Sequence, residues 1–377
     1  MNLRRTRAIA RKETLHILRD PRSLLMALAI PFLLLILFSY ALTLDVDRIP
    51  TMIYDADQTP ASRELIRRLQ GSRYFQVLAF TDRYATIERA IDQNTVLIGI
   101  VIPRGFARDL FSGQQATVQL LLDGSDSNTA SIALGYVNTL LQLYALEWRT
   151  QMLNRRQGGE PVPPVEGRIR VWYNSELRSR NYIVPGLIAI IMMIIASLLT
   201  SLTIAREWEM GTMEQLLSTP LRPAELILGK MVPYFGIGLI DMLIALSVGT
   251  LVFRVPLRGS LLFLGSVACL FLFGALCWGL LLSALTRSQL LAYQMSILTS
   301  FLPSFLLSGF IYAIENMPRV IQLITYLIPA RYFITILQGI FLKGIGLSYL
   351  VFETGMLLLF AGVVFWGAMR ALPRKLV

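Results

Sequence analysis

Long apolar runs divide this chain into segments that fit a membrane and segments that fit water. Six runs are almost free of charge, and they cover residues 23–44, 182–205, 232–253, 261–285, 290–311 and 349–369. A helix of about 20 apolar residues is long enough to cross the hydrocarbon core of a bilayer. The pattern therefore predicts an α-helical integral membrane protein with six transmembrane helices.

The segment between the first two runs, residues 45–181, has the composition of a water-soluble domain. Short stretches rich in β-branched residues predict strands at 49–54, 75–80, 96–102 and 117–122. Helical periodicity occupies the stretches between and after them, at 60–69, 85–93, 105–111 and 127–153. This alternation predicts an inserted extracytoplasmic α/β domain with a small mixed or parallel sheet.

Acidic residues follow two of the predicted strands. Asp55 and Asp57 come after the first strand, and Asp123 and Asp126 come after the last. Carboxylates at such positions serve either as turn and helix caps or as a cation or catalytic site. We favour caps, because Asp, Gly and Ser just after a strand commonly form turns and helix caps. The domain contains no histidine, no cysteine and no G-x-S-x-G motif, so acyl-transfer chemistry has little support.

The net charge of +11 lies almost entirely outside this domain. Residues 45–181 contain 16 Lys and Arg against 15 Asp and Glu, so the basic excess flanks the apolar runs. With both termini in the cytoplasm, 14 basic residues fall on that side and five in the short outer connections, as the positive-inside rule requires. The distribution predicts cytoplasmic N- and C-termini and contact with the lipid bilayer, and it argues against nucleic acid as a partner.

Further segments flank or connect the predicted spans. Residues 1–22 indicate an amphipathic cytoplasmic entry helix, and residues 370–377 a cytoplasmic tail. Residues 312–348 contain Pro318 and Pro329, and their apolar stretches are too short to cross a bilayer. Such stretches re-enter or lie against the bundle, so we expect re-entrant helices on the outer side.

The entry helix combines basic and apolar side chains. Seven basic residues lie opposite Ala8, Leu15 and Leu18, which suits a helix at the membrane interface with its basic face among anionic headgroups. The alternative is a plain basic tail that only sets the topology. We expect no role for His16 within this segment.

The cytoplasmic loop 206–231, between the second and third spans, is the most informative stretch of the sequence. Its first part, 206–220, is strongly charged at the start and ends at a proline. Thr212 and Gln215 have the spacing of a capping box, which predicts a short helix. A rigid helix held between two spans is suited to receive force from a cytoplasmic partner, and the alternative is a solvated loop with ordinary caps.

This loop resembles the signature of ABC type 2 transport permeases. The matching residues are Glu207, Glu209, Gly211, Thr212, Glu214, Leu216, Leu217, Thr219, Pro220, Glu225, Gly229, Lys230, Pro233 and Tyr234. The similarity extends over nearly the whole chain and is greatest to bacterial multidrug-efflux permeases with a large periplasmic domain after the first transmembrane helix. Met210 departs from the pattern, since many relatives have a basic residue there.

The resemblance implies the transmembrane permease subunit of an ATP-driven exporter in the bacterial inner membrane, which moves drugs, lipids or other amphipathic molecules outward. The implied partners are two cytoplasmic ABC ATPase subunits, a second permease copy or paralogue and, as a further candidate, a periplasmic adaptor protein. ATP and Mg belong to the ATPase, because this chain has no G-x-x-x-x-G-K-[ST] motif. We therefore expect no cofactor in this chain and no enzyme activity of its own.

The resemblance also assigns roles to residues. It implies ATPase coupling for Glu207, Trp208, Glu209, Gly211, Thr212, Glu214, Gln215, Leu216, Leu217, Thr219 and Pro220. Of these, it places Glu207, Glu209, Gly211, Thr212 and Glu214 nearest the ATPase. Lys12, Glu13, Arg19 and Asp20 look like the family's entry helix, and Ser308, Gly309 and Arg331 look like its outer re-entrant region.

Asp241 is the clearest carboxylate inside a predicted span. An ionisable residue at that depth is costly unless it is paired or hydrated, so Asp241 is a candidate for lining a pathway or a dimer seam. The alternative is a locally hydrogen-bonded structural residue. Cys269 and Cys277 lie eight residues apart in one apolar run, which is too far apart on a helix for a disulfide. The lone histidine is far away in the sequence, so we expect no metal site either.

A membrane sensor with a periplasmic ligand-binding domain is the alternative function. The short cytoplasmic segments contain no output module, so a sensor needs a separate effector. A proton-coupled transporter has less support, because several intramembrane carboxylates and an inverted repeat are expected there.

Overall fold

The computed structural model describes residues 2–42, 47–157, 173–174 and 178–372. The chain divides into two compact units. The helical unit comprises Met1–Thr43 and Val171–Val377, and the α/β unit comprises Leu44–Arg170.

The α/β unit contains a four-stranded sheet with the strand order β2-β1-β3-β4. Its strands are β1 (Ile49–Asp55), β2 (Phe75–Thr81), β3 (Ile98–Ile102) and β4 (Gln119–Leu122). β1 pairs in parallel with β2 and with β3, whereas β3 pairs antiparallel with β4. Of the two arrangements that the sequence predicts, the sheet has the mixed one.

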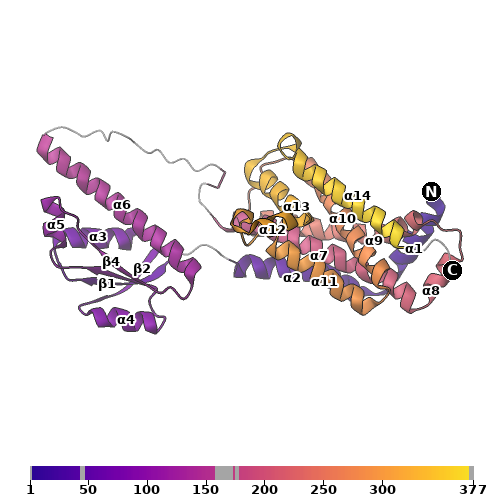
Figure 1. Cartoon of the computed structure of the whole chain (residues 1–377), viewed down its shortest axis with the longest axis horizontal. Coiled ribbons are helices and arrows are strands. Elements are labelled where there is room, and N and C mark those ends of the chain that lie inside the picture. Colours follow the sequence, from indigo (N-terminus) through magenta and orange to yellow (C-terminus); the bar gives the residue numbers. More distant parts are fainter. Residues whose placement is uncertain (1, 43–46, 158–172, 175–177, 373–377) are drawn as a thin grey trace. The chain divides into compact units, whose positions relative to one another are not determined.

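Helices cover both faces of this sheet. They are α3 (Pro60–Gly71), α4 (Tyr84–Asp92), α5 (Phe106–Ser112) and α6 (Ser127–Gln157). Figure 1 shows α3 and α6 on one face and α4 on the other. Ile53 and Ile100 of the sheet form a buried core with Leu65 of α3 and Val137 of α6. All four strands and four helices that the sequence predicts are present.

The acidic residues at the strand ends act as caps. The Asp57 carboxylate accepts hydrogen bonds from the N–H groups of Gly105 (2.8 Å) and Ala107 (3.0 Å), at the start of α5. The other three carboxylates each accept backbone N–H groups of the turn that follows them, namely Asp55, Asp123 and Asp126. The capping interpretation is confirmed.

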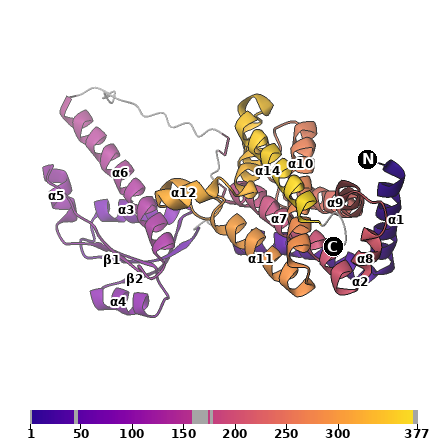
Figure 2. The ribbon, with the colours of Figure 1, turned by 45° about the vertical axis from the view of Figure 1, so that its right-hand side comes forward.

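The helical unit is built around one central helix. Its helices are α1 (Leu3–Arg19), α2 (Pro21–Ala41), α7 (Arg180–Glu209), α8 (Thr212–Leu217), α9 (Pro223–Ser247), α10 (Leu261–Thr286), α11 (Gln289–Leu306), α12 (Arg319–Thr325), α13 (Pro329–Gln338) and α14 (Val351–Ala371). Helix α7 packs against α2, α9, α10, α11 and α13. Of its most apolar window 78% is buried, against 17% for α2 and 22% for α14. Figures 1 and 2 show α1 and α8 at one end of this unit and α12 toward the other.

Five helices of the described residues are long and apolar enough to cross a membrane. They cover Leu24–Ala41, Arg180–Glu209, Pro223–Val252, Leu261–Thr286 and Val351–Ala371. A sixth span results if Arg319–Thr325 and Pro329–Lys343, which meet at 79°, count as one broken helix. Helix α11 ends at Leu306, so it covers only part of the predicted span 290–311, and it is not among the five. Gln289, Tyr293 and Gln294 make its first turns polar.

Helix α11 nevertheless extends along nearly the whole of α7. At its start, the Gln289 N–H donates to the Glu209 carboxylate (2.8 Å) at the end of α7. Just after its end, the carbonyls of Gly309 and Phe310 accept from the Tyr182 hydroxyl (2.9 and 3.0 Å) at the beginning of α7. The two helices are therefore antiparallel and reach the same two ends of the bundle.

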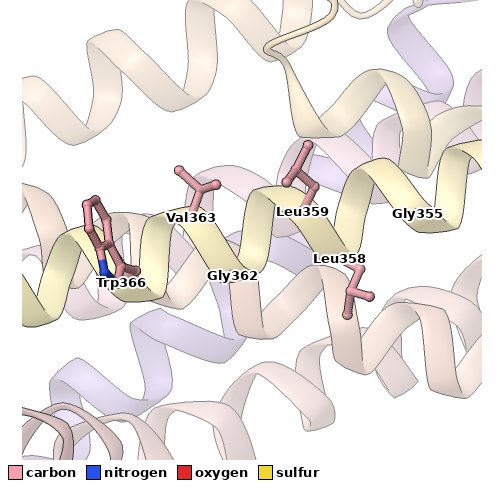
Figure 3. Close-up of a pocket in the computed structure, with 6 residues that line it drawn as sticks. All are labelled: Gly355, Leu358, Leu359, Gly362, Val363 and Trp366. Carbon is pink, nitrogen blue, oxygen red and sulfur yellow. The ribbon is translucent and has the colours of Figure 1, made fainter.

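The outward face of α14 is apolar. Figure 3 shows Leu358, Leu359, Val363 and Trp366 projecting from this helix around Gly355 and Gly362, where they line a shallow groove. These four side chains are 53–63% exposed. An apolar face of this kind suits contact with hydrocarbon chains or with another membrane helix.

Candidate functional site

A cluster of charged side chains joins three helices at the end of the bundle where α8 lies. The Glu207 carboxylate, at the end of α7, accepts hydrogen bonds from Lys12 (2.8 Å), from Lys230 (3.1 Å) and from the Thr212 hydroxyl. The Lys230 ammonium also donates to Glu13 (2.6 Å). Lys12 and Glu13 come from α1 and Lys230 from α9. We call these four charged residues, Lys12, Glu13, Glu207 and Lys230, the ion network.

Most of the ion network is buried. Lys230 is 1% exposed, Glu13 5% and Glu207 8%, whereas the side chain of Lys12 is 57% exposed. Buried charges persist only when they are well partnered, and removing one partner leaves an uncompensated charge that costs about 3–5 kcal/mol. The network therefore holds α1 firmly against α7 and α9.

Residues beside Glu207 reach other elements. The Arg206 guanidinium donates to His16 Nε2 on α1 (2.9 Å), a contact that the sequence did not indicate. Arg287 lies in the turn between α10 and α11, and its guanidinium is 4.6 Å from the centre of the Trp208 ring. With the contact of Glu209 to α11, every side chain from 206 to 209 connects the end of α7 to another element.

The turn into α8 depends on Gly211. This residue has φ = 70°, in the left-handed region that favours glycine, and it is the N-cap of α8. No side chain caps the helix, so the predicted capping box of Thr212 and Gln215 was wrong. Because Gly211 takes the capping position, Thr212 becomes the first helical residue, and its hydroxyl donates to Glu207 instead.

Helix α8 has one face buried and one exposed. Met213 is fully buried in the core of the helical unit, and Leu216 packs against the same core. The exposed residues between 210 and 220 are Met210, Gly211, Glu214, Gln215, Ser218, Thr219 and Pro220. We call Met210, Gly211, Glu214 and Gln215 the coupling surface, after the role that the resemblance implies for this loop. The side chain of Leu217 lies outside the described part of the structure.

The start of α9 packs tightly against α1. A Cβ atom added at Gly229 would lie 2.7 Å from Ile9 Cβ and 3.0 Å from the Thr6 carbonyl oxygen, so only glycine permits this approach. The buried Glu225 carboxylate accepts a hydrogen bond from the Asn2 N–H, at the N-terminus of α1. Arg19 and Asp20, at the end of α1, lie outside the ion network.

The family profile described as ABC-2 family transporter protein matches residues 21–370. The chain belongs to this family. It is 40% identical to the probable multidrug ABC transporter permease YbhS of Escherichia coli, over 91% of this chain and 90% of that protein. It is 33% identical to the probable multidrug ABC transporter permease YbhR of E. coli, over 90% of each chain. It is 28% identical to the inner membrane transport permease YhhJ of E. coli, over 79% of this chain and 78% of that one.

Two groups of loop residues can now be distinguished in this ABC-2 permease. Glu207 and Thr212, which the resemblance placed nearest the ATPase, have their side chains turned inward to the ion network. Glu214 and Gln215, by contrast, are exposed. Sequence reasoning missed this division, because the positions of Lys12 and Lys230 beside Glu207 depend on how α1 docks.

The residues that the resemblance assigns to a re-entrant region lie in and near the segment that follows α11. Gly309 has φ = 84°, and its carbonyl binds Tyr182, whereas the neighbouring Ser308 is buried. The Arg331 guanidinium lies 4.1 Å from the centre of the Tyr326 ring and donates to Thr325. Arg331 thereby supports the sharp bend between α12 and α13.

Asp241 lies within α9 and is 1% exposed in the single chain. Neither carboxylate oxygen has a hydrogen-bond partner in the described part of the permease. The burial places this side chain inside one subunit rather than on its lipid-facing surface.

Proposed function

We propose that this ABC-2 permease is the membrane subunit of an ATP-driven exporter and that its ATPase docks on the coupling surface. The observation that carries this proposal is the construction of α8. Met213 and the Thr212 contact to Glu207 anchor the helix, while Glu214 and Gln215 are free to meet a partner. A helix that is held on one side and exposed on the other is suited to receive force.

Force on α8 has a direct route into the bundle. The Thr212 hydroxyl donates a hydrogen bond to Glu207 at the end of α7. Lys12 and Lys230 connect Glu207 to α1 and α9. When the ATPase closes around ATP and Mg, we expect α8 to shift and to carry these three helices with it. Because α7 contacts most of the other helices, its displacement opens and closes the path of the substrate.

The assembly that supports this cycle contains more than one chain. We propose two permeases, either two copies or a copy and a paralogue, with two ATPase subunits in the cytoplasm. The distribution of basic residues favours cytoplasmic termini in the bacterial inner membrane, with the α/β unit in the periplasm. A periplasmic adaptor is a further candidate partner for that unit.

The substrates are proposed to be amphipathic or apolar molecules such as drugs or lipids. Two of the relatives are named as probable multidrug permeases, and the chain is alignable with them over nine-tenths of its length. Transport by vesicles should cease when the partner ATPase carries an inactivating substitution, and export undiminished by that change would refute the proposal.

Charge reversal tests the docking surface. Glu214→Lys should reduce copurification of the ATPase by about tenfold, because it places a like or unpaired charge in the interface. Glu88→Lys is the matched control, since Glu88 is an exposed helical glutamate on α4 of the α/β unit. Equal recovery of ATPase with both variants would remove α8 from the interface.

A further inference from the structure

Asp241 differs from the other buried charges of the helical unit. Glu13, Glu207, Glu225 and Lys230 all have partners that accept or donate hydrogen bonds. Asp241 is buried equally well, but both of its oxygens lack a hydrogen-bond partner among the described residues. Asp241 is therefore a carboxylate in an apolar, membrane-length helix to which the described residues offer no hydrogen bond.

An unsatisfied carboxylate in a membrane span needs compensation from outside the chain. Burying a charge without a partner is strongly unfavourable, so the group either takes up a proton or meets a cation that enters the bundle. A metal ion is a poor candidate, because Ca²⁺ or Mg²⁺ requires several oxygen ligands and Asp241 offers one carboxylate. Its buried neighbours on α9, Ile237, Met242 and Ala245, are apolar. This environment suits a cation that is itself largely apolar.

The helix that carries Asp241 is interrupted on both sides of it. Pro233 lies inside α9 before Asp241, and a π-helical turn, Val248–Val252, follows it. Proline removes a backbone hydrogen bond from a helix, and π-helical turns occur frequently at functional sites. Asp241 thus lies between two places where α9 can bend.

Asp241 is also on the helix that coupling reaches first. Helix α8 ends at Leu217, and α9 begins at Pro223, only a short turn later in the chain. The ion network holds the first turns of α9 through Lys230. Movement of α8 therefore changes the position of α9, and a bend at Pro233 would open the packed region around Asp241 to a ligand.

We propose that Asp241 is the specificity-determining residue for organic cations, which makes lipophilic cations with delocalised charge a substrate class of this permease. This inference rests on the proposed export function and names a substrate for it. In the resting state Asp241 is enclosed, and it pairs with the cation once α9 has moved. The apolar groups of the cation then pack against the neighbouring apolar side chains, and the ion pair compensates the buried carboxylate.

Equilibrium binding of tetraphenylphosphonium to the purified permease–ATPase complex tests this proposal. Asp241→Asn should weaken that binding by about tenfold or more, because it removes a desolvated countercharge at constant size. Asp241→Glu should keep most of the affinity. Glu353→Gln is the matched control, a carboxylate neutralised in α14, and it should bind the cation as the wild type does. The neutral triphenylphosphine oxide should bind equally to all four proteins.

The outcomes separate this proposal from the exporter function. Absence of cation binding by the wild type overturns it, as does unchanged binding by Asp241→Asn, which would mark Asp241 as a protonated structural acid. Equal loss of cation and phosphine oxide binding also overturns it. Thermal unfolding of the wild-type complex gives a test that does not depend on whether the variants fold. Tetraphenylphosphonium should raise the Tm of the wild type more than triphenylphosphine oxide does. Equal shifts in Tm count against the proposal. Copurification and ATP hydrolysis in the same preparations report on the exporter function alone.

Discussion

Lys230 is the residue on which the ion network depends. Its ammonium group lies between two carboxylates, 2.6 Å from Glu13 and 3.1 Å from Glu207, and almost no water reaches it. Each carboxylate alone would be costly to bury, and the two would repel one another. One buried cation between them therefore stabilises two helix contacts at once.

Replacing Lys230 should destabilise the permease far more than replacing Lys12. Lys230→Met leaves the buried Glu13 without a cation and Glu207 with only the largely exposed Lys12, which should cost about 3–5 kcal/mol. Lys12→Met, the matched control, removes a largely exposed partner of the same Glu207, which should cost below about 1 kcal/mol. Thermal unfolding of the purified permease in detergent measures the difference.

A double variant checks the cause. Adding Glu13→Gln to Lys230→Met neutralises one stranded carboxylate, so it should recover part of the lost stability. If Lys12→Met and Lys230→Met lower Tm equally, or if the double variant is the least stable, the burial of Lys230 does not control the stability of this region.

At the scale of elements, the contact between α1 and α9 is closer than side chains normally allow. Gly229→Ala would force Ile9 and the backbone at Thr6 away from α9, and overpacking of this kind costs about 1–3 kcal/mol. Gly236→Ala is the control on the same helix, since a Cβ there meets nothing within 4 Å. Trypsin should cleave at the arginines of α1 faster in the Gly229 variant only. Equal cleavage of both variants would show that α1 does not rely on this contact.

The elements themselves were largely predictable, because their signals are local. The alternation in 49–122 indicated the strands and helices of the α/β unit, and the apolar runs indicated the long helices. The pairing of Glu13 with Lys230 was beyond reach, because these residues are 217 positions apart and meet only when α1 docks on α9. The capping box predicted for Thr212 and Gln215 was wrong. The spacing of these residues fitted a capping box, but Gly211 occupies the N-cap position of α8.

At the scale of the whole molecule, the course of α11 decides the topology. Its hydropathy is lower than that of the other spans, because it carries polar residues in its first turns and buried serines, Ser296, Ser300 and Ser304, further along. Yet it runs from the end of α7 at Glu209 to the beginning of α7 at Tyr182. These three serines are buried against other helices, and the exposed Tyr293 and Gln294 lie near one end of α11. The helix is therefore able to cross a bilayer despite its composition.

Cysteine accessibility distinguishes the two possible sixth spans. If α11 crosses the membrane and α12 and α13 re-enter from outside, Tyr312 faces the periplasm. If the bent pair crosses instead, Tyr312 faces the cytoplasm.

We expect α11 to be the span, and Tyr312→Cys tests this in a chain with both native cysteines replaced by alanine. This residue is 60% exposed, so the cysteine should react in intact cells with a membrane-impermeant maleimide. Tyr349→Cys, which is 78% exposed and periplasmic in both topologies, is the positive control. Gln215→Cys on the coupling surface should react only after the membrane is opened. If Tyr312→Cys also reacts only after the membrane is opened, the sixth span is the bent pair and not α11. The residues after α11 would then lie on the same side of the membrane as the ATPase.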